Sequence, residues 1–397
     1  MPKAREPAMG RTPAEQLLCA VARGAAGLPV PELRPSAALD GVDWGMVPHG
    51  LRRHGLQALG AALLAPARER MPAPVWAAIA RDALDARTAA LGMFAELRRI
   101  IDELRGLGVD AMTYKGSVMA WDAYGDLGAR PFVDLDLLVR PADADRALAV
   151  LDAAGYASVV RDTPARDAWF RRVDGDYQLV HRDSGLLVEL HVRAMSRRFG
   201  PGLETDALWR RRRALALAGT ELAAPADDDA LFLHLVHGAK HRWERLEWVA
   251  ATAALLRRVE GDVSPLLREP YRAPRAVLLG AWIAHEIAGA PLAPATRSAI
   301  ARDPAVAPLT AAVRAHLFAP SPTDDRDETA AKLAFNLRVQ RGVTARARFI
   351  YRWLAWPSPE DWSEVSLPDW IFGAYRLLRP LRLARRYAAR PARPAHG

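Results

Sequence analysis

The stretch that decides the fold is RPFVDLDLLVRP at residues 130–141, where apolar residues alternate with two aspartates. Successive side chains of a strand point to opposite faces, so Asp134 and Asp136 share a face, roughly 7 Å apart. The opposite face is expected to pack into a core and consists of Val133, Leu135, Leu137 and Val139. Aspartate is depleted in strands, so the pair predicts a shared function; a solvated face of an antiparallel strand is the simpler alternative.

A phosphate site is predicted just upstream. The segment VDAMTYKG at 109–116 is strand-like, and GSVMAWDAYGD then has the character of a helix beginning at Gly116 and Ser117. Backbone N–H groups at a helix start bind anions, and Lys115 and Arg130 add positive charge near it.

A third carboxylate follows in a predicted hairpin. Two β-rich runs, DYQLVH at 176–181 and LLVELHVR at 186–193, flank the turn RDSG. Glu189 lies within the second run and is expected beside the aspartates, where three carboxylates and a phosphate site can hold two magnesium ions and a triphosphate. His191 shares the strand face of Glu189 and is a weaker candidate for a ligand or general base.

Helical patterns surround these strands. The segment TPAEQLLCAVARG at 12–24 has a Thr cap, an early Pro and a terminal Gly, and further helical patterns follow to residue 105 and again after 227. We therefore expect an α+β fold, a small mixed-sheet core between two helical regions. The expected divisions are an N-terminal helical region at 1–105, the core at 106–220, a C-terminal helical domain at 221–375 and a basic tail at 376–397.

The bulk composition sets limits on the class of protein. The chain has 397 residues, 51% of them hydrophobic and 25% charged, which is typical of a globular protein. Its lone cysteine, Cys19, excludes an intrachain disulfide or a thiolate metal cluster, and a cytoplasmic location is expected. No apolar run approaches the roughly 20 residues of a membrane span. The net charge of +9 favours anionic partners, although arginine-rich coding alone could produce it.

One segment after the core combines basic and imidazole side chains. It is HLVHGAKHRWERLEW at 234–248, expected within one long helix at 228–258. Lys240, His241 and Arg242 are candidates for triphosphate or acceptor contacts, across a cleft from the carboxylate strand. His234, His237 and His241 recur at helical intervals, where packed histidines are more common than a metal site.

The tail places arginines at helical intervals, at Arg376, Arg379, Arg382, Arg385 and Arg386. A solvated helix face is the simpler interpretation, and binding of an acidic peptide or nucleic acid is the alternative. Nucleic acid is not favoured, because no aromatic residues are interleaved for base stacking.

The segments KGS, DLDLLV and VELHV together resemble the DNA polymerase beta-like nucleotidyltransferase superfamily. Over about residues 75–390 the chain is similar to a bacterial family of uncharacterised nucleotidyltransferases, some of which are encoded beside natural-product genes such as lasso-peptide clusters. The resemblance implies that Gly116 and Ser117 hold the triphosphate, that Asp134 and Asp136 bind two Mg²⁺ ions, with Mn²⁺ as a substitute, and that Glu189 binds the catalytic ion.

The implied reaction moves a nucleoside monophosphate from a nucleoside triphosphate such as ATP to a hydroxyl or phosphate of a small molecule or peptide, with release of pyrophosphate. Two departures from the family pattern bear on it: the longer spacing of 17 positions from Ser117 to Asp134, and Ala251 where relatives often have Asp. Two alternatives remain. A nucleotide-sugar glycosyltransferase also uses Asp-x-Asp, but its nucleotide-binding sheet would precede the motif, where this chain is helical. A non-catalytic nucleotide-binding or regulatory member is the other.

Overall fold

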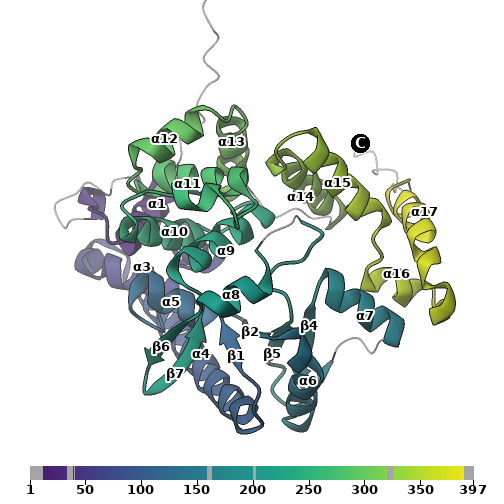
Figure 1. The fold of residues 1–397 in the computed structure, drawn as a ribbon. Helices are drawn as coiled ribbons and strands as arrows, with labels where there is room; N and C mark the ends of the chain where they lie inside the picture. Colours follow the sequence, from purple (N-terminus) through teal and green to yellow (C-terminus); the bar gives the residue numbers. More distant parts are fainter. Residues whose placement is uncertain are drawn as a thin grey trace, which may run out of the picture.

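A seven-stranded mixed sheet forms the centre of the molecule (Figure 1). The computed structural model describes residues 12–33, 39, 41–158, 163–199, 203–319 and 325–388. The strand order is β3-β4-β5-β2-β1-β7-β6. The strands are β1 (Ala111–Thr113), β2 (Asp134–Val139), β3 (Tyr156–Ser158), β4 (Asp176–His181), β5 (Leu187–His191), β6 (Arg213–Leu217) and β7 (Thr220–Ala224). The expected α+β fold with a mixed-sheet core is confirmed.

The sheet is mixed because β2 pairs with β5 in parallel and with β1 antiparallel. The predicted hairpin is present as β4 and β5, which pair antiparallel. The hairpin of β6 and β7 was not expected, since its sequence RALALAGTELAA is rich in the helix formers Ala and Leu. Its two-residue turn has Ala218 and Gly219 at φ of 47° and 79°, a conformation that glycine adopts readily.

Helices cover both faces of the sheet (Figure 1). In the first half of the chain they are α1 (Pro13–Ala25), α2 (Met46–Arg53), α3 (Gln57–Leu64), α4 (Ala73–Gly106), α5 (Gly116–Tyr124), α6 (Ala144–Ala153) and α7 (Pro164–Val173). In the second half they are α8 (Thr205–Arg211), α9 (Asp227–Lys240), α10 (Leu246–Arg258), α11 (Pro274–Ala288), α12 (Pro294–Ala301), α13 (Val306–Leu317), α14 (Asp325–Val339), α15 (Val343–Ala355), α16 (Pro359–Glu364) and α17 (Tyr375–Ala388).

The apolar face of β2 packs under α4 and α6. Leu135, Leu137 and Val139 are buried there in one core with both helices. Val133, predicted as part of this face, is 75% exposed because the strand begins only at Asp134. The packing of this face turns Asp134 and Asp136 toward the other side of the sheet.

The second core lies on that other side. It joins the N-terminal helices α1–α3 to α9–α13 and includes Met112 and Leu138 from the sheet. Helices that precede the strands in the chain therefore share one core with helices that follow them. This packing holds α9 and α10 over the carboxylate face.

The long helix expected at 228–258 is two helices. Helix α9 ends at Lys240 and α10 begins at Leu246, and between them Arg242 and Trp243 have left-handed φ values of 58° and 53°. The turn inserts the fully buried Trp243 ring against Gly238 and Gly280, where a Cβ at either glycine would come within 2.6 Å of the indole. Burial of this indole outweighs the helix preference of the local sequence.

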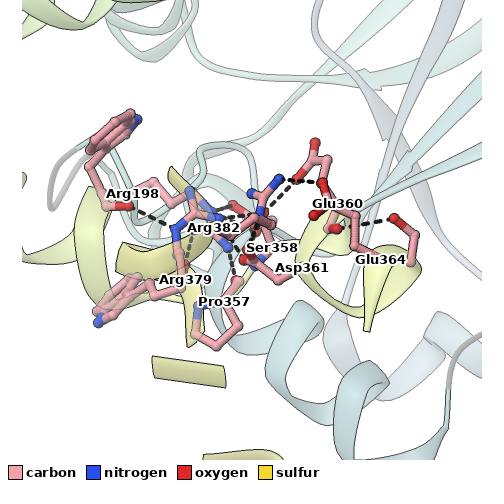
Figure 2. Close-up of polar contacts among 12 residues, drawn as sticks. Arg198, Pro357, Ser358, Glu360, Asp361, Glu364, Arg379 and Arg382 are labelled. Atoms are coloured by element: carbon pink, nitrogen blue, oxygen red, sulfur yellow. Dashed lines mark hydrogen bonds and ion pairs between the residues drawn. The ribbon is translucent and has the colours of Figure 1, made fainter. Parts of the chain in front are cut away.

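The C-terminal arm, residues 343–388 (α15–α17), packs beside α7 with a small apolar core of its own (Figure 1). Its polar anchor is Asp361, which accepts from Arg379 at 2.6 Å and from Arg382 at 2.5 Å (Figure 2). Arg198, which follows β5, donates to the carbonyl oxygens of Trp356 and Pro357.

Two of the tail arginines are therefore not on a solvated face. Arg379 is 6% exposed, and Arg382 is half-buried by its two carboxylate partners. Arg385 and Arg386 are exposed as expected, and residues 389–397 lie outside the described residues.

Candidate active site

The register of β2 and β5 brings the predicted carboxylates together. Asp136 is the direct partner of Glu189 in the parallel pair. In the next antiparallel pair, Gln178 and Asp176 of β4 lie opposite Glu189 and His191. Paired residues point to the same side of a sheet, so three adjacent strands present polar side chains to one face.

At the centre of this face, two basic side chains contact two carboxylates. Lys115 Nζ donates to Asp136 Oδ1 at 2.6 Å and lies 3.9 Å from Glu189 Oε2. His191 Nε2 lies 2.9 Å from the same Asp136 oxygen and 3.4 Å from Glu189 Oε2. Asp136 is only 4% exposed, so the two basic groups offset a charge that burial would otherwise make costly.

These contacts decide the protonation of the cluster. Burial raises the pKa of Asp136, but Lys115 and the His191 hydrogen bond outweigh it, and the pKa is lowered. The hydrogen bond from His191 is the main cause that lowers the pKa of Glu189. Burial lowers the pKa of His191, and its bonds to Asp136 and Glu189 reverse this and raise it. The contacts within the cluster therefore favour ionised carboxylates and a protonated imidazole.

Asp134 has a different environment. Burial, followed by repulsion from Asp136 and Glu189, raises its pKa to about 6. It lines the same cavity as Glu189 and His191. An added cation beside Asp134 would relieve both of the repulsions that raise its pKa.

The start of α5 is built as the sequence predicted. Gly116 begins the helix at φ of 47°, a left-handed conformation that favours glycine, with Lys115 before it at the cap position. Ser117 is 1% exposed, and its hydroxyl has no hydrogen-bond partner among the described residues. Lys115 lines the cavity over the carboxylates, whereas Gly116 and Ser117 do not line it.

A cavity of about 390 Å³ opens over the carboxylates. Its strand wall includes Asp134, Glu189 and His191, and its opposite wall comes from α9 and the start of α10. Lys240 and His241 line it, so the predicted pairing of this segment with the carboxylate strand across a cleft agrees with the geometry. Arg242 is not part of the lining.

Aromatic rings make up part of the helical wall. The ring centroids of His237 and His241 are 4.6 Å apart, and Trp248 lies 5.1 Å from the first and 5.7 Å from the second. Burial lowers the pKa of His241 to about 3 and that of His237 well below its usual value, so both rings are neutral. The three rings meet in tilted and edge-to-face contacts and form an uncharged aromatic patch on the wall that also contains Lys240.

The alternative that the α9 histidines bind a metal is not supported. His234 Nε2 lies 3.1 Å from the carbonyl oxygen of Trp248, so its ring is held by the backbone. Burial lowers the pKa of His234 to about 4, and the ring donates this bond as a neutral imidazole. It is a packed histidine that fixes α10 against α9.

Two further positions that the sequence singled out are Arg130 and Ala251. Arg130 lines the cavity, but its guanidinium lies 3.0 Å from the buried carboxylate of Glu247, which offsets its charge. Ala251 is fully buried in the core of α10 and does not line the cavity. An aspartate at this position would therefore need a different packing of α10.

The sequence did not single out several polar and aromatic residues of the cavity, among them Asp174, Asp176, Gln178 and Trp248. Asp176 and Gln178 alternate along β4 in the manner of the Asp-x-Asp strand, and this alternation was the available signal. Burial raises the pKa of Asp176. Asp174 precedes the strand and is held by Arg198 at 2.8 Å, a contact between distant segments.

The donor set fits a divalent cation. One ligand atom each from Asp136, Glu189 and His191 lies within 4.8 Å of the others, close enough to converge on one ion. Carboxylate oxygens suit Mg²⁺ and Mn²⁺, whereas the imidazole of His191 can join them as a ligand only after it loses the proton that its contacts with Asp136 and Glu189 favour. The same carboxylates already accept the ammonium of Lys115, so the geometry accommodates positive charge.

The mixed sheet presents adjacent carboxylates beside the start of α5, which is the arrangement that the resemblance to nucleotidyltransferases implied. The chain belongs to the family of uncharacterised nucleotidyltransferases, whose sequence profile matches residues 40–289. This match contains the carboxylate strands and α9, and it ends before the C-terminal arm.

Among solved structures, the chain is similar to an antigenic nucleotidyltransferase-like protein from Paracoccidioides brasiliensis. The two are 15% identical, with a TM-score of 0.31 over 52% of this chain and 93% of the other. No curated protein matches the sequence significantly. None of the described helices has the length and apolar character needed to cross a bilayer.

Proposed function

We propose that the protein transfers a nucleoside monophosphate from a nucleoside triphosphate to a hydroxyl or phosphate of a small molecule or peptide, with release of pyrophosphate. The observation that supports this most is the register that pairs Asp136 with Glu189, with Asp134 on the same face of a cavity. Family membership gives the general reaction class, and the cavity supplies space for a nucleotide.

Asp134, Asp136 and Glu189 would hold the divalent ions, as the resemblance implies. Bound Mg²⁺ or Mn²⁺ would supply charge stabilisation of the triphosphate and a lowered pKa of the acceptor hydroxyl. His191 would keep the two buried carboxylates oriented through its hydrogen bonds to both. We assign it a positioning role rather than that of a general base, because its contacts favour the protonated ring.

The remaining polar groups would position the triphosphate. Gly116 and Ser117 do not line the cavity, but they begin α5 next to Lys115, so the positive end of the helix dipole would add to the charge of Lys115. Lys240 brings a positive charge from the opposite wall. Burial and the nearby Lys115 lower the pKa of Lys240, so an added anion between the two lysines would relieve their repulsion.

The aromatic wall suits the nucleobase. Trp248, His237 and His241 lie on the side of the cavity opposite the carboxylates, and stacking on aromatic faces tolerates any base. A triphosphate at the carboxylates would thus extend its base toward α9 and α10. This placement does not select one base, so a direct assay with each triphosphate identifies the preferred nucleotide.

The test is mass spectrometry of a pool of hydroxyl- and phosphate-bearing compounds incubated with each triphosphate and Mg²⁺ or Mn²⁺. We expect one product to gain the mass of a nucleoside monophosphate while pyrophosphate accumulates, and Asp136→Asn to abolish both. Transfer of a sugar from a nucleotide sugar in a parallel reaction would overturn the proposal.

A further inference from the structure

A second cavity, of about 450 Å³, adjoins the candidate active site. Met195, Phe199, Val236 and Lys240 line both cavities and form the wall between them. The far walls of the second cavity come from α11, α14 and α15. A ligand in the second cavity would therefore lie against the site proposed for the triphosphate, with only a few side chains between them.

The second cavity is lined by basic residues. They are Lys240, Arg272, Arg275, Arg341, Arg348 and Arg352, and none of the described lining residues is acidic. We call this space the arginine cavity. The neighbouring cavity also has basic lining residues, but four acidic ones accompany them: Asp134, Asp174, Asp176 and Glu189.

Not all of these arginines are available for a ligand. Arg275 is buried and paired with Asp303 at 2.9 Å, so it supports the fold. Arg272 pairs with Glu269 at 3.0 Å outside the cavity. Arg352 has a neutral partner, the carbonyl oxygen of Arg197 at 2.9 Å, and the exposed Arg341 and Arg348 complete the wall. The wall of the arginine cavity therefore carries more positive charge than its ion pairs with Asp303 and Glu269 neutralise.

The pKa of Arg352 also reflects this excess of positive charge. Burial lowers its pKa, and the positive charges of Arg348 and Arg197 lower it further. The guanidinium of Arg352 thus lies among like charges, which an anion between them would relieve. Arginine stays charged and matches the geometry of phosphate with its planar fork of donors.

We propose that the arginine cavity binds the phosphate group of a small acceptor, whose hydroxyl then reaches past Lys240 toward Asp136 and Glu189. This inference rests on the proposed function. A cavity of about 450 Å³ has the size of a small-molecule site, which favours a phosphorylated metabolite-sized acceptor over a nucleic acid. The two cavities together would separate the two substrates by charge: triphosphate with metal on the carboxylates, acceptor phosphate on the arginines.

The transfer step balances with these two substrates alone. The acceptor oxygen forms a bond to the α-phosphorus of the triphosphate, and the bond from that phosphorus to the oxygen bridging to the β-phosphate breaks. Pyrophosphate leaves with the electron pair, and the proton of the acceptor hydroxyl passes to water.

The test uses the full chain and inorganic tripolyphosphate as the probe. The carboxylate cavity is first saturated with a non-hydrolysable nucleoside triphosphate and Mg²⁺, and tripolyphosphate is then titrated by calorimetry. We expect one further site, with affinity at least tenfold weaker in the double variant Arg341→Glu/Arg348→Glu. The matched control is Arg385→Glu/Arg386→Glu, which makes the same change of charge on exposed residues of α17 and should bind as the unmodified protein does.

The outcomes separate this inference from the proposed function. A saturable triphosphate site without a second anion site, or equal weakening in both double variants, overturns the arginine cavity and leaves the proposed function standing. Tripolyphosphate binding that depends on Arg341 and Arg348, in a protein that binds no triphosphate, overturns the proposed function and keeps the anion site. Binding of a single-stranded oligoribonucleotide but not of tripolyphosphate at the same arginines contradicts a small acceptor.

Discussion

Lys115 Nζ donates a 2.6 Å hydrogen bond to Oδ1 of the buried Asp136. The lysine precedes the helix start proposed for the triphosphate, and the aspartate belongs to the strand proposed for the metal. The contact thus links the two halves of the candidate site. It also places a cation against the carboxylate that a metal ion would use.

Removal of this ammonium should destabilise the metal-free protein. Lys115→Met leaves Asp136 with His191 as its remaining close cation, and breaking a buried pair costs about 3 kcal/mol. Urea unfolding in EDTA should show a loss of this order, and Mg²⁺ should restore more stability to the variant than to the unmodified protein. Lys332→Met, which removes a half-exposed partner of Glu328, is the control and should cost less than about 1 kcal/mol. Similar losses in both variants would contradict the account.

Glu189 should matter for transfer more than for binding. If Glu189 holds only the catalytic ion, Glu189→Gln slows turnover by orders of magnitude and leaves triphosphate affinity nearly unchanged, since the second ion binds together with the nucleotide. Rapid-quench assays and calorimetry measure the two quantities separately. Glu221→Gln, on the exposed side of β7, should change neither. Turnover close to that of the unmodified protein in Glu189→Gln would remove Glu189 from the mechanism.

Two buried histidines predict loss of stability in acid. Burial lowers the pKa of His54 to about 3 and that of His234 to about 4, whereas both return to about 6.5 on unfolding. Their contribution is complete above pH 6.5 and is lost as the pH falls, because the unfolded chain takes up the protons first. At pH 5 each should cost about 2 kcal/mol relative to pH 7.5.

His234→Gln provides the check, because its amide can still donate to the carbonyl of Trp248. Urea midpoints measured between pH 7.5 and 5 should fall less steeply in this variant. His191 has a raised pKa in the folded protein, so its contribution to stability grows as the pH falls, and this contribution is the same in both proteins. An unchanged slope would show that His234 is protonated in the folded protein.

The C-terminal arm should loosen when its buried ion pair is broken. Arg379→Met removes one of the two arginines that pair with Asp361, leaving Arg382, and also removes the bond from Arg379 to Ser358 Oγ (Figure 2). Hydrogen exchange should accelerate across α16 and α17 while β2 and β5 remain protected. Arg386→Met, on the exposed side of α17, should leave exchange unchanged. Uniform acceleration throughout the chain would mean that the arm and the sheet unfold as one unit.

The sequence predicts the site well where local patterns and side-chain chemistry coincide. Asp134 and Asp136 interrupt an apolar strand, and Gly116 opens a helix, so each leaves a signal within a few residues. Their approach to Glu189 depends on strand pairing, which the sequence suggests only through the third carboxylate in a β-rich run.

Features that depend on tertiary packing could not be predicted. The break after Lys240 contains neither Gly nor Pro and exists because Trp243 fills the space beside Gly238 and Gly280. The burial of Arg379 depends on Asp361, 18 residues earlier in the chain, and the hairpin at 213–224 is built from residues that favour helices. The same applies to Asp174, which reaches the cavity from a segment without a motif of its own, whereas Trp248 belongs to the segment 234–248 but carries no charge or imidazole that would mark it there.

The most direct measurement is calorimetry of a non-hydrolysable nucleoside triphosphate with Mg²⁺. We expect one saturable site in the unmodified protein, weakened by EDTA and lost in Asp134→Asn/Asp136→Asn, while Asp82→Asn/Asp126→Asn, at two carboxylates that pair with Arg52 and Arg87 and do not line the cavity, binds normally. A double variant at Asp134 and Asp136 that folds and binds the triphosphate with unchanged, EDTA-insensitive affinity would contradict the assignment of the carboxylate face as the nucleotide site.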